Sequence, residues 1–494
     1  MTVNRNLKKS RPYDEPPKRR RRLIPDGPDS AATGFFVAAA VWLAIATGIG
    51  LLAIGIRIVP FELSLPLGLF DLGFELDRRR VDYAFMNATV FGWLTNAAFA
   101  AIAFMIPRLF GRRLAGIPFV NLGVAIWNLS LAGGIAALYV FDLGPNGALS
   151  AMPWLFEGGL ATGAVIVTLA FLATVRTDIR AGYVSSWFAG IALLGLAGLV
   201  GLNAAIGLVE LFVELPTLTV ALASVFVERA ILTMWLLGMA YAALHYVVPR
   251  ATGQPLASGG LGALTWLTWL ALAPASALAA LRDPSVPFIF TTLGQVATIL
   301  LLVPAALAFV NLVQSMQGRW SLLFGSGPLA FAAVSLAFLL ASSLLFAIAS
   351  LTTVSAAVRG TDWDRGAFVW AAYGAFTFAA FALAEHALPR ILRRAWGGGF
   401  LAGAQLWLAF GGATLAGMSL MGGGLAEGSL RAAGTAPEAI DAALVFYRVP
   451  AFMGMGLVAL AGLAMLANLF LMYTSGEPAD YVIPGQAASA AAGH

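Results

Sequence analysis

Long apolar segments alternate with short polar connections along almost the whole chain. Each segment holds about twenty residues or more, enough for a helix to cross roughly 30 Å of hydrocarbon. The pattern therefore predicts an all-α polytopic membrane protein with about twelve transmembrane helices. Their approximate limits are 34–57, 83–107, 118–141, 151–175, 183–206, 222–248, 259–281, 288–313, 328–352, 366–388, 399–422 and 446–473.

The same pattern divides the chain into three parts. Residues 1–33 carry nine Lys or Arg, are rich in proline and lack an apolar period, so we expect a disordered basic cytoplasmic tail. Residues 34–475 are predicted to form the twelve-helix transmembrane domain, and 476–494 a short C-terminal cytoplasmic tail. Abundant Gly and Ala within the spans predict close helix packing. We recognise no internal repeat among the spans.

Composition limits the chemistry. Hydrophobic residues make up 60% of the chain and charged residues only 11%, whereas a soluble domain carries about 25% charged residues. There is no cysteine, which excludes disulfides, thiolate metal sites, iron–sulfur clusters and covalently attached c-type haem within this chain. Histidine, the usual haem and copper ligand, occurs only at His245, His386 and His494.

The basic residues predict an orientation. Positive residues favour the cytoplasmic side, so both termini are expected inside, in the inner membrane of a bacterium. The weak point is Arg78–Arg80, which falls outside beside Glu75, Asp77 and Asp82. We read the KRRRR run of the tail as a topogenic signal and expect the lipid bilayer, and no nucleic acid, as its partner. The predicted inside loops hold Arg108, Arg112, Arg113, Arg176, Arg180, Arg250, Arg319, Arg390, Arg393 and Arg394.

Four charged residues fall at membrane depth: Glu157, Glu228, Arg229 and Glu385. Each costs about 2.5–3.5 kcal/mol at mid-bilayer, so each needs a partner or a wet cavity. For Glu385, a position near a helix end that lets the side chain reach the interface is an equal alternative. Glu228 and Arg229 are adjacent, so they point in different directions and should have separate partners.

Two histidines precede Pro-Arg pairs, in LHYVVPR (244–250) and EHALPR (385–390). Proline disfavours continuation of a helix, so these residues are predicted to lie near helix ends on the cytoplasmic side. We interpret His245 and His386 as capping or interfacial residues rather than as metal ligands.

A polar hexapeptide, TDWDRG, interrupts the apolar pattern and opens TDWDRGAFVWAAYG (361–374). Three further segments are MNATVFGWLTNAAFAAIAFMIPR (86–108), LLGMAYAALHYVVPR (236–250) and FTTLGQVATILLLVPAALAFVNLV (290–313). Taken together and in this order, they resemble subunit I of cbb3-type cytochrome c oxidases in the haem–copper oxidase superfamily. The resemblance implies a haem–copper oxidase subunit I-like bundle, with the hexapeptide at the start of its tenth helix.

The resemblance also implies where haem and copper ligands should fall, and none of these positions holds a histidine. The low-spin haem histidine of the second helix falls on Phe85, and the two haem histidines of the tenth fall on Ala367 and Val369. The copper histidines fall on Arg229, Ala275 and Ser276, and the tyrosine used in oxygen chemistry falls on Trp269.

We therefore expect neither haem nor copper to be held by this chain. Haem b and copper would be expected from the family, but imidazole donors are missing, although Met86 beside Phe85 could ligate one iron. Empty apolar volume is costly, so bulky side chains are predicted to fill the vacated haem cavity. These side chains are Phe85, Trp269, Phe368 and Trp370. Arg229 is predicted to replace the copper charge and to pair with a carboxylate such as Glu157.

Three functions remain open at this point. The favoured one is a ligand-stripped, non-catalytic structural or assembly subunit beside other membrane subunits of a respiratory complex. The alternative is a membrane binding or transport protein that uses the vacated cavity for a lipid, quinone or small solute. A working terminal oxidase with unusual ligation is the least favoured, and whether the chain is an enzyme is left undecided.

Overall fold

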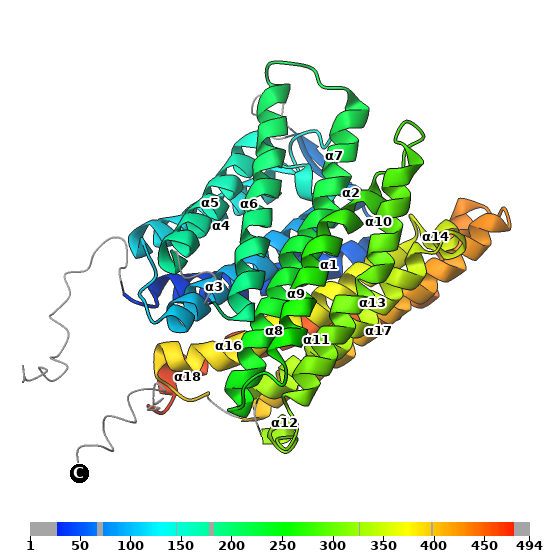
Figure 1. The fold of residues 1–494 in the computed structure, drawn as a ribbon. Coiled ribbons are helices and arrows are strands. Elements are labelled where there is room, and N and C mark those ends of the chain that lie inside the picture. Colours follow the sequence, from blue (N-terminus) through cyan, green and yellow to red (C-terminus); the bar gives the residue numbers. More distant parts are fainter. Residues whose placement is uncertain are drawn as a thin grey trace, which may run out of the picture.

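The computed structural model describes residues 27–66, 73–144, 146–176, 182–325, 327–396 and 399–478 (Figure 1). Most of the predicted N-terminal tail, the KRRRR run and His494 lie outside these residues. Within them, twelve helical spans are long and apolar enough to cross a membrane. The prediction of a twelve-helix all-α bundle is confirmed.

The spans are close to the predicted ones but longer at several ends. Nine are α1 (Ser30–Ile58), α4 (Ile117–Ala137), α5 (Trp154–Val175), α6 (Val184–Glu210), α9 (Gly259–Ala277, followed by η5, Leu278–Ala280), α10–α11 (Phe288–Leu300 and Leu302–Gln314), α13 (Gly327–Ser350), α17 (Gly399–Ala432) and α18 (Pro437–Ser475). Short elements between spans are the antiparallel strands β1 (Leu63–Pro66) and β2 (Gly73–Leu76), the single turn η2 (Ala148–Ser150), α12 (Leu322–Gly325) and α14 (Thr352–Val358).

The other three spans share an unusual construction. Each begins as an α-helix, widens into a π-helical segment and continues as an α-helix. They are α2–η1–α3 (Arg78–Asn87, Ala88–Leu94, Thr95–Phe110), α7–η4–α8 (Thr217–Ala230, Ile231–Leu236, Leu237–Thr252) and α15–η6–α16 (Asp362–Val369, Trp370–Phe376, Thr377–Leu392). Isolated π-helical turns are rare and often accompany functional sites.

These three spans are an internal repeat, which corrects our sequence-based expectation of none. In each, a Pro-Arg pair follows the π-helical segment at the same spacing, at Pro107, Pro249 and Pro389. The first and third spans also align as FGWLTNAAF (91–99) and YGAFTFAAF (373–381). The repeat escaped sequence inspection because the copies share only these few residues.

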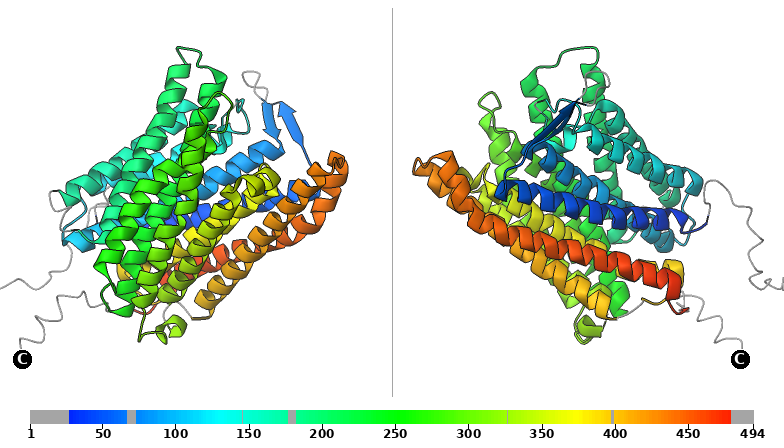
Figure 2. Two further views of the ribbon diagram at one scale, coloured as in Figure 1. Left: turned by 45° about the vertical axis from the view of Figure 1, so that its right-hand side comes forward. Right: turned by 180° about the vertical axis from the view of Figure 1, so that it is seen from behind.

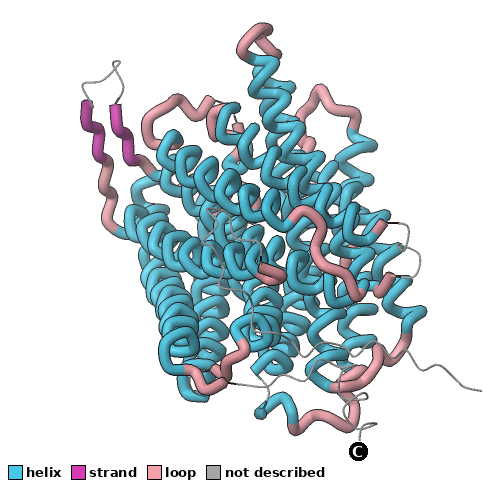
Figure 3. The backbone as a smooth tube through the Cα atoms, turned by 90° about the vertical axis from the view of Figure 1, so that its left-hand side faces the viewer, coloured by secondary structure: helices cyan, strands magenta, loops and turns pink. Residues whose placement is uncertain are grey.

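The repeat gives the bundle two distinct ends. We call the end where α15 begins the Asp362 end, and the opposite end, near the Pro-Arg pairs, the His386 end. The β1–β2 hairpin projects beyond the helices at the Asp362 end (Figures 2 and 3). Both described termini lie at the His386 end: Asp29 pairs with Arg108 at 2.8 Å, and Pro478 bridges to Arg394.

At the His386 end, three rings, one from each repeated span, pack against one another. Phe104, Tyr246 and His386 occupy the same position before each Pro-Arg pair and meet edge to face, with ring centroids 5.7–6.2 Å apart. His386 and His245 are each only 4% exposed, so neither is interfacial as expected. His245 Nδ1 lies 2.8 Å from the Tyr241 carbonyl of its own helix and caps no helix end.

Candidate ligand cavity

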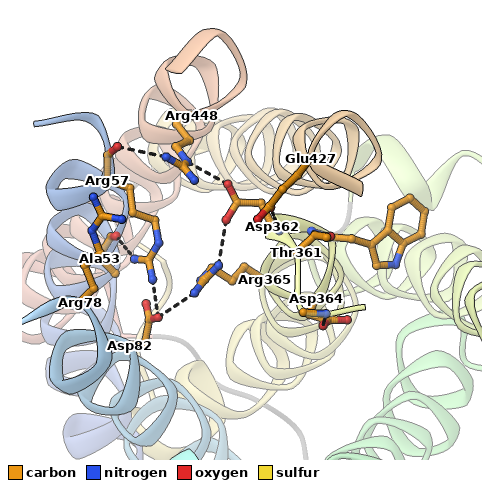
Figure 4. A network of polar contacts seen from close by, with 12 residues as sticks. Ala53, Arg57, Arg78, Asp82, Thr361, Asp362, Asp364, Arg365, Glu427 and Arg448 are labelled. Atoms are coloured by element: carbon orange, nitrogen blue, oxygen red, sulfur yellow. Dashed lines mark hydrogen bonds and ion pairs between the residues drawn. The ribbon is translucent and has the colours of Figure 1, made fainter. Parts of the chain in front are cut away.

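The polar hexapeptide forms the N-terminal cap and first turns of α15. The Thr361 side chain caps the helix by accepting a hydrogen bond from the Trp363 N–H at 3.2 Å. Asp362 follows in the first turn, only 1% exposed. Its two carboxylate oxygens accept from Arg448 Nε at 2.9 Å and Arg365 Nη1 at 2.8 Å (Figure 4).

The ion pairs continue on either side of Asp362. Arg365 also reaches Asp82 Oδ2 at 3.2 Å, and the same oxygen pairs with Arg57 at 2.5 Å. On the other side, Arg448 Nη1 pairs with Asp441 at 2.9 Å. These contacts form a polar network that joins α1, α2, α15 and α18, and Figure 4 shows the charges alternating around it.

The network extends to α17 through the backbone. The Asp362 N–H donates to Glu427 Oε2 at 2.7 Å, and Glu427 in turn pairs with Arg431. Five helices that are distant in sequence are therefore tied together where the hexapeptide begins. A buried charge is tolerated when it is paired and hydrogen-bonded, which explains why so apolar a chain keeps these residues.

Beside this network lies a cavity of about 620 Å³, formed by α1, α2, α7, η5, α13, α14 and α15. Four of the positions singled out in the sequence line it together: Phe85, Arg229, Ala367 and Val369. Ala275 is not among its lining residues, and neither is Ser276, which is fully buried and donates to the Ala273 carbonyl at 2.7 Å.

Aromatic side chains pack around the cavity but do not fill it, so that prediction was wrong. Phe85 meets Phe368 edge to face at 5.8 Å and stacks on Tyr373 at 6.1 Å. Trp370 packs on a neighbouring ring at 4.7 Å. Trp269 is fully buried elsewhere and donates to the Thr233 carbonyl at 3.0 Å. The space between these rings and the network remains open.

Arg229 does not pair with Glu157, contrary to our prediction. Its guanidinium lies over the Phe346 ring, 5.1 Å from the centroid. Glu157 lines a different cavity of about 350 Å³ together with Glu210, and its buried Oε1 has no hydrogen-bond partner.

The other two charges at membrane depth are held differently. Glu228 lies against the loop before η2, where a Cβ added at Gly147 would be 2.9 Å from Glu228 Oε2. Glu228 and Arg229 line the same cavity, although their side chains have different contacts. Glu385 is 4% exposed and its Oε1 is also unpartnered, so it does not extend to the interface.

Two further arginines line the cavity from segments outside the spans. Arg282, just after η5, donates to the Ser355 hydroxyl at 2.7 Å. Burial, together with the nearby positive charge of Arg359, lowers the pKa of Arg282. In the part of the chain that the structure describes, no carboxylate forms an ion pair with Arg229, Arg282 or Arg359.

The cavity does not fit two haems and a copper ion. Its lining holds no histidine, and its only thioether is Met86. The hydroxyl of Tyr83 is engaged, since it donates to the Asn146 carbonyl at 2.8 Å. Across the described ranges, no group of three or more His, Asp or Glu is placed to hold a metal ion. His245 and His386 belong to the opposite end.

Comparison with known proteins places the fold in a family. The family described as Cytochrome C and Quinol oxidase polypeptide I matches residues 30–462. The Cbb3-type cytochrome c oxidase subunit CcoN1 of Stutzerimonas stutzeri is 24% identical over 421 residues, covering 80% of this chain and 82% of that protein. The Cytochrome c oxidase subunit 1 homolog of Azorhizobium caulinodans is 25% identical over 354 residues, covering 68% of this chain and 62% of that protein.

A solved structure shares the fold. A chain of a heme-copper terminal oxidase dimer, determined by cryo-EM, superposes with a TM-score of 0.73 at 12% identity, covering 93% of this chain and 86% of that one. At this identity the likeness shows the fold alone, and it confirms the expected subunit I-like bundle. With the family match over most of its length, the chain belongs to the cytochrome c and quinol oxidase polypeptide I family, as a divergent membrane protein of the haem–copper oxidase superfamily.

Proposed function

We propose that this chain is a ligand-stripped, non-catalytic member of its family that serves as a structural or assembly subunit of a respiratory complex. The observation that carries the proposal is the lining of one cavity by Phe85, Arg229, Ala367 and Val369. In the resemblance to cbb3-type subunit I, these are ligand positions for haem and copper. None of these side chains offers a nitrogen lone pair to a metal, because the guanidinium stays protonated.

The repeat supports this assignment of positions. Counted back from the proline of each Pro-Arg pair, Phe85 and Ala367 both lie 22 residues earlier, and Arg229 and Val369 both lie 20 residues earlier. Residues assigned as ligand positions on different helices therefore fall on equivalent sites of the repeat. A shift of the alignment by one or two residues would bring no histidine into the cavity.

The proposed setting is the inner membrane of a bacterium, with the His386 end in the cytoplasm. Arg108, Arg250 and Arg390 lie at that end, where Arg108 pairs with Asp29. At the Asp362 end, Arg80 pairs with Glu75 and with Asp77. This pairing supports the proposed orientation, because it offsets the charge of Arg80 within the basic run at 78–80.

Affinity purification from native membranes tests the subunit role. The tagged full-length chain, extracted in a mild detergent, is expected to carry haem-bearing membrane subunits through gel filtration at a fixed stoichiometry. An Arg319→Gln variant, altered on an exposed loop at the His386 end, serves as a matched control and should retain the same partners. Recovery of a lone chain that consumes oxygen with a reduced electron donor would contradict the proposal.

A second candidate function has one observation in its favour. The cavity of about 620 Å³ stays open although aromatic side chains surround it, as a membrane binding or transport protein would require. Recovery of the chain alone, with a small molecule bound, would favour this function over the subunit role.

A further inference from the structure

The charges that line the cavity are unbalanced. Five arginines face three carboxylates: Arg57, Arg229, Arg282, Arg359 and Arg365 against Asp82, Glu228 and Asp364. Arg57 and Arg365 share the Asp82 carboxylate within the network. Of the two remaining carboxylates, Glu228 lies against the loop before η2, where a Cβ added at Gly147 would be 2.9 Å from its Oε2, and Asp364 accepts from the Gly360 N–H at 2.8 Å. Among the described residues, Arg229, Arg282 and Arg359 form no ion pair, and one nearby carboxylate, Asp364, attracts all three.

Arg229 is the deepest of these three. It lies in the last turn of α7 before the π-helical segment, and it also lines a smaller apolar cavity of about 60 Å³ that extends inward. Arg282 is close enough for the two positive charges to repel each other, and Arg359 repels Arg282 in turn, while Asp364 attracts all three and Glu228 attracts Arg229. A cation at membrane depth normally has a counter-charge, and here three arginines share two carboxylates among the described residues, neither of them within ion-pair distance.

The remaining walls are apolar. Phe85, Phe346 and Phe368 face the cavity together with Leu232. A ligand that suits both surfaces needs an anionic head and an apolar body. Guanidinium groups bind carboxylate and phosphate oxygens through paired, charge-assisted hydrogen bonds. A neutral quinone would leave the three arginines unpaired, and a cation would add to the repulsion.

We propose that this cavity binds an amphipathic anion. Its carboxylate or phosphate head would lie at Arg229, Arg282 and Arg359, and its apolar body would lie against the phenylalanine rings. The proposal rests on the proposed absence of haem from the same space. It holds whether the chain works alone or as a subunit. The source of the ligand is either an anionic membrane lipid or a free amphipathic acid, because both present the same chemistry.

Calorimetric titration of the purified full-length chain in neutral detergent tests the proposal, with decanoate as probe and decanol as its uncharged counterpart. Decanoate is expected to bind saturably and decanol at least about tenfold more weakly. Arg229→Gln should weaken decanoate binding by about tenfold or more, while Arg229→Lys, which keeps the charge, falls between the two. Arg250→Gln, at the His386 end, is the matched control and should bind like the unaltered protein.

If Arg229→Gln does not fold, Arg282→Gln takes its place, and its affinity for decanoate is expected to fall several-fold. Equal decanoate binding by the unaltered chain and by both glutamine variants would overturn the proposal, as would equal binding of decanoate and decanol. In nanodiscs, displacement of decanoate by phosphatidylglycerol but not by phosphatidylcholine supports the lipid source, and no displacement by either supports the free acid.

The haem content of the same preparation separates this proposal from the proposed function. A haem-free protein that fails to bind decanoate overturns the anion site alone. Stoichiometric haem overturns both, because the haem would occupy the space and contradict the loss of ligands.

Discussion

The two ends of the repeated helices differ in how similar the three copies are at equivalent positions. At the His386 end, each copy supplies one ring to the triangle of Phe104, Tyr246 and His386, followed by the same Pro-Arg pair. At the Asp362 end, the equivalent positions hold unrelated side chains, such as Asn87, Arg229 and Val369. Packing requirements repeat at one end, whereas the other end has lost any common pattern.

We attribute this difference to what each end of the helices borders. At the His386 end, side chains from all three copies pack against one another, so the same ring and proline positions recur in each copy. The other half borders a cavity of about 620 Å³ and a network of ion pairs, where each copy meets a different neighbour. The repeated packing therefore belongs to the His386 half, whereas the Asp362 half holds the ion-pair network and the proposed ligand site.

The largest expected effect comes from breaking the network at its centre. Asp362→Asn leaves the buried guanidinium of Arg448, 4% exposed, without its closest buried partner. Removing one member of a buried ion pair costs about 3–5 kcal/mol, so the midpoint of thermal unfolding in detergent should fall markedly. Asp283→Asn is the control, because that exposed carboxylate bonds only to Ser285. An unchanged midpoint for Asp362→Asn would show that the network does not hold this end.

A smaller effect is expected from separating α15 and α17. A Cβ at Gly424 would lie 2.1 Å from the Trp363 backbone nitrogen, which cannot move without shifting the cap of α15. We expect Gly424→Ala to destabilise the fold by about 1–3 kcal/mol, measured by the same unfolding midpoint. Gly411→Ala on the same helix meets nothing within 4 Å, and it should be neutral or slightly stabilising. Equal behaviour of the two variants would argue against the close approach.

The smallest effect concerns the contact between two copies of the repeat. Thr89 Oγ1 and the Tyr373 hydroxyl share a buried hydrogen bond of 2.8 Å between η1 and η6. Tyr373→Phe removes it and should cost about 1 kcal/mol. Tyr447→Phe is a matched control, since no hydrogen bond of the Tyr447 hydroxyl is found among the described residues. If both variants unfold at the same midpoint, the Thr89–Tyr373 hydrogen bond does not contribute to stability.

The helices could be predicted from the sequence because their signal is local. Twenty apolar residues specify a span wherever they occur, so the twelve spans follow from composition alone. The relation to cbb3-type subunit I rested on short phrases such as TDWDRG, and the family match confirms it. Both inferences needed only neighbouring residues.

The network and the cavity could not be predicted in the same way. Arg57, Asp82, Asp362 and Arg448 are far apart in sequence and meet only when four helices pack. The pairing expected between Arg229 and Glu157 was wrong because charge at membrane depth does not reveal which face of a helix it occupies. The repeated Pro-Arg pairs at Pro107, Pro249 and Pro389 were a visible signal of the internal repeat.

The most direct test of the central claim is a haem and copper assay on the purified chain, using its absorbance spectrum, pyridine haemochrome and metal analysis. Since Phe85, Ala367, Val369 and Arg229 occupy the family ligand positions in one cavity, we predict neither haem nor copper in stoichiometric amount. One or more haems per chain, accompanied by copper, would contradict the loss of ligands and restore a catalytic role.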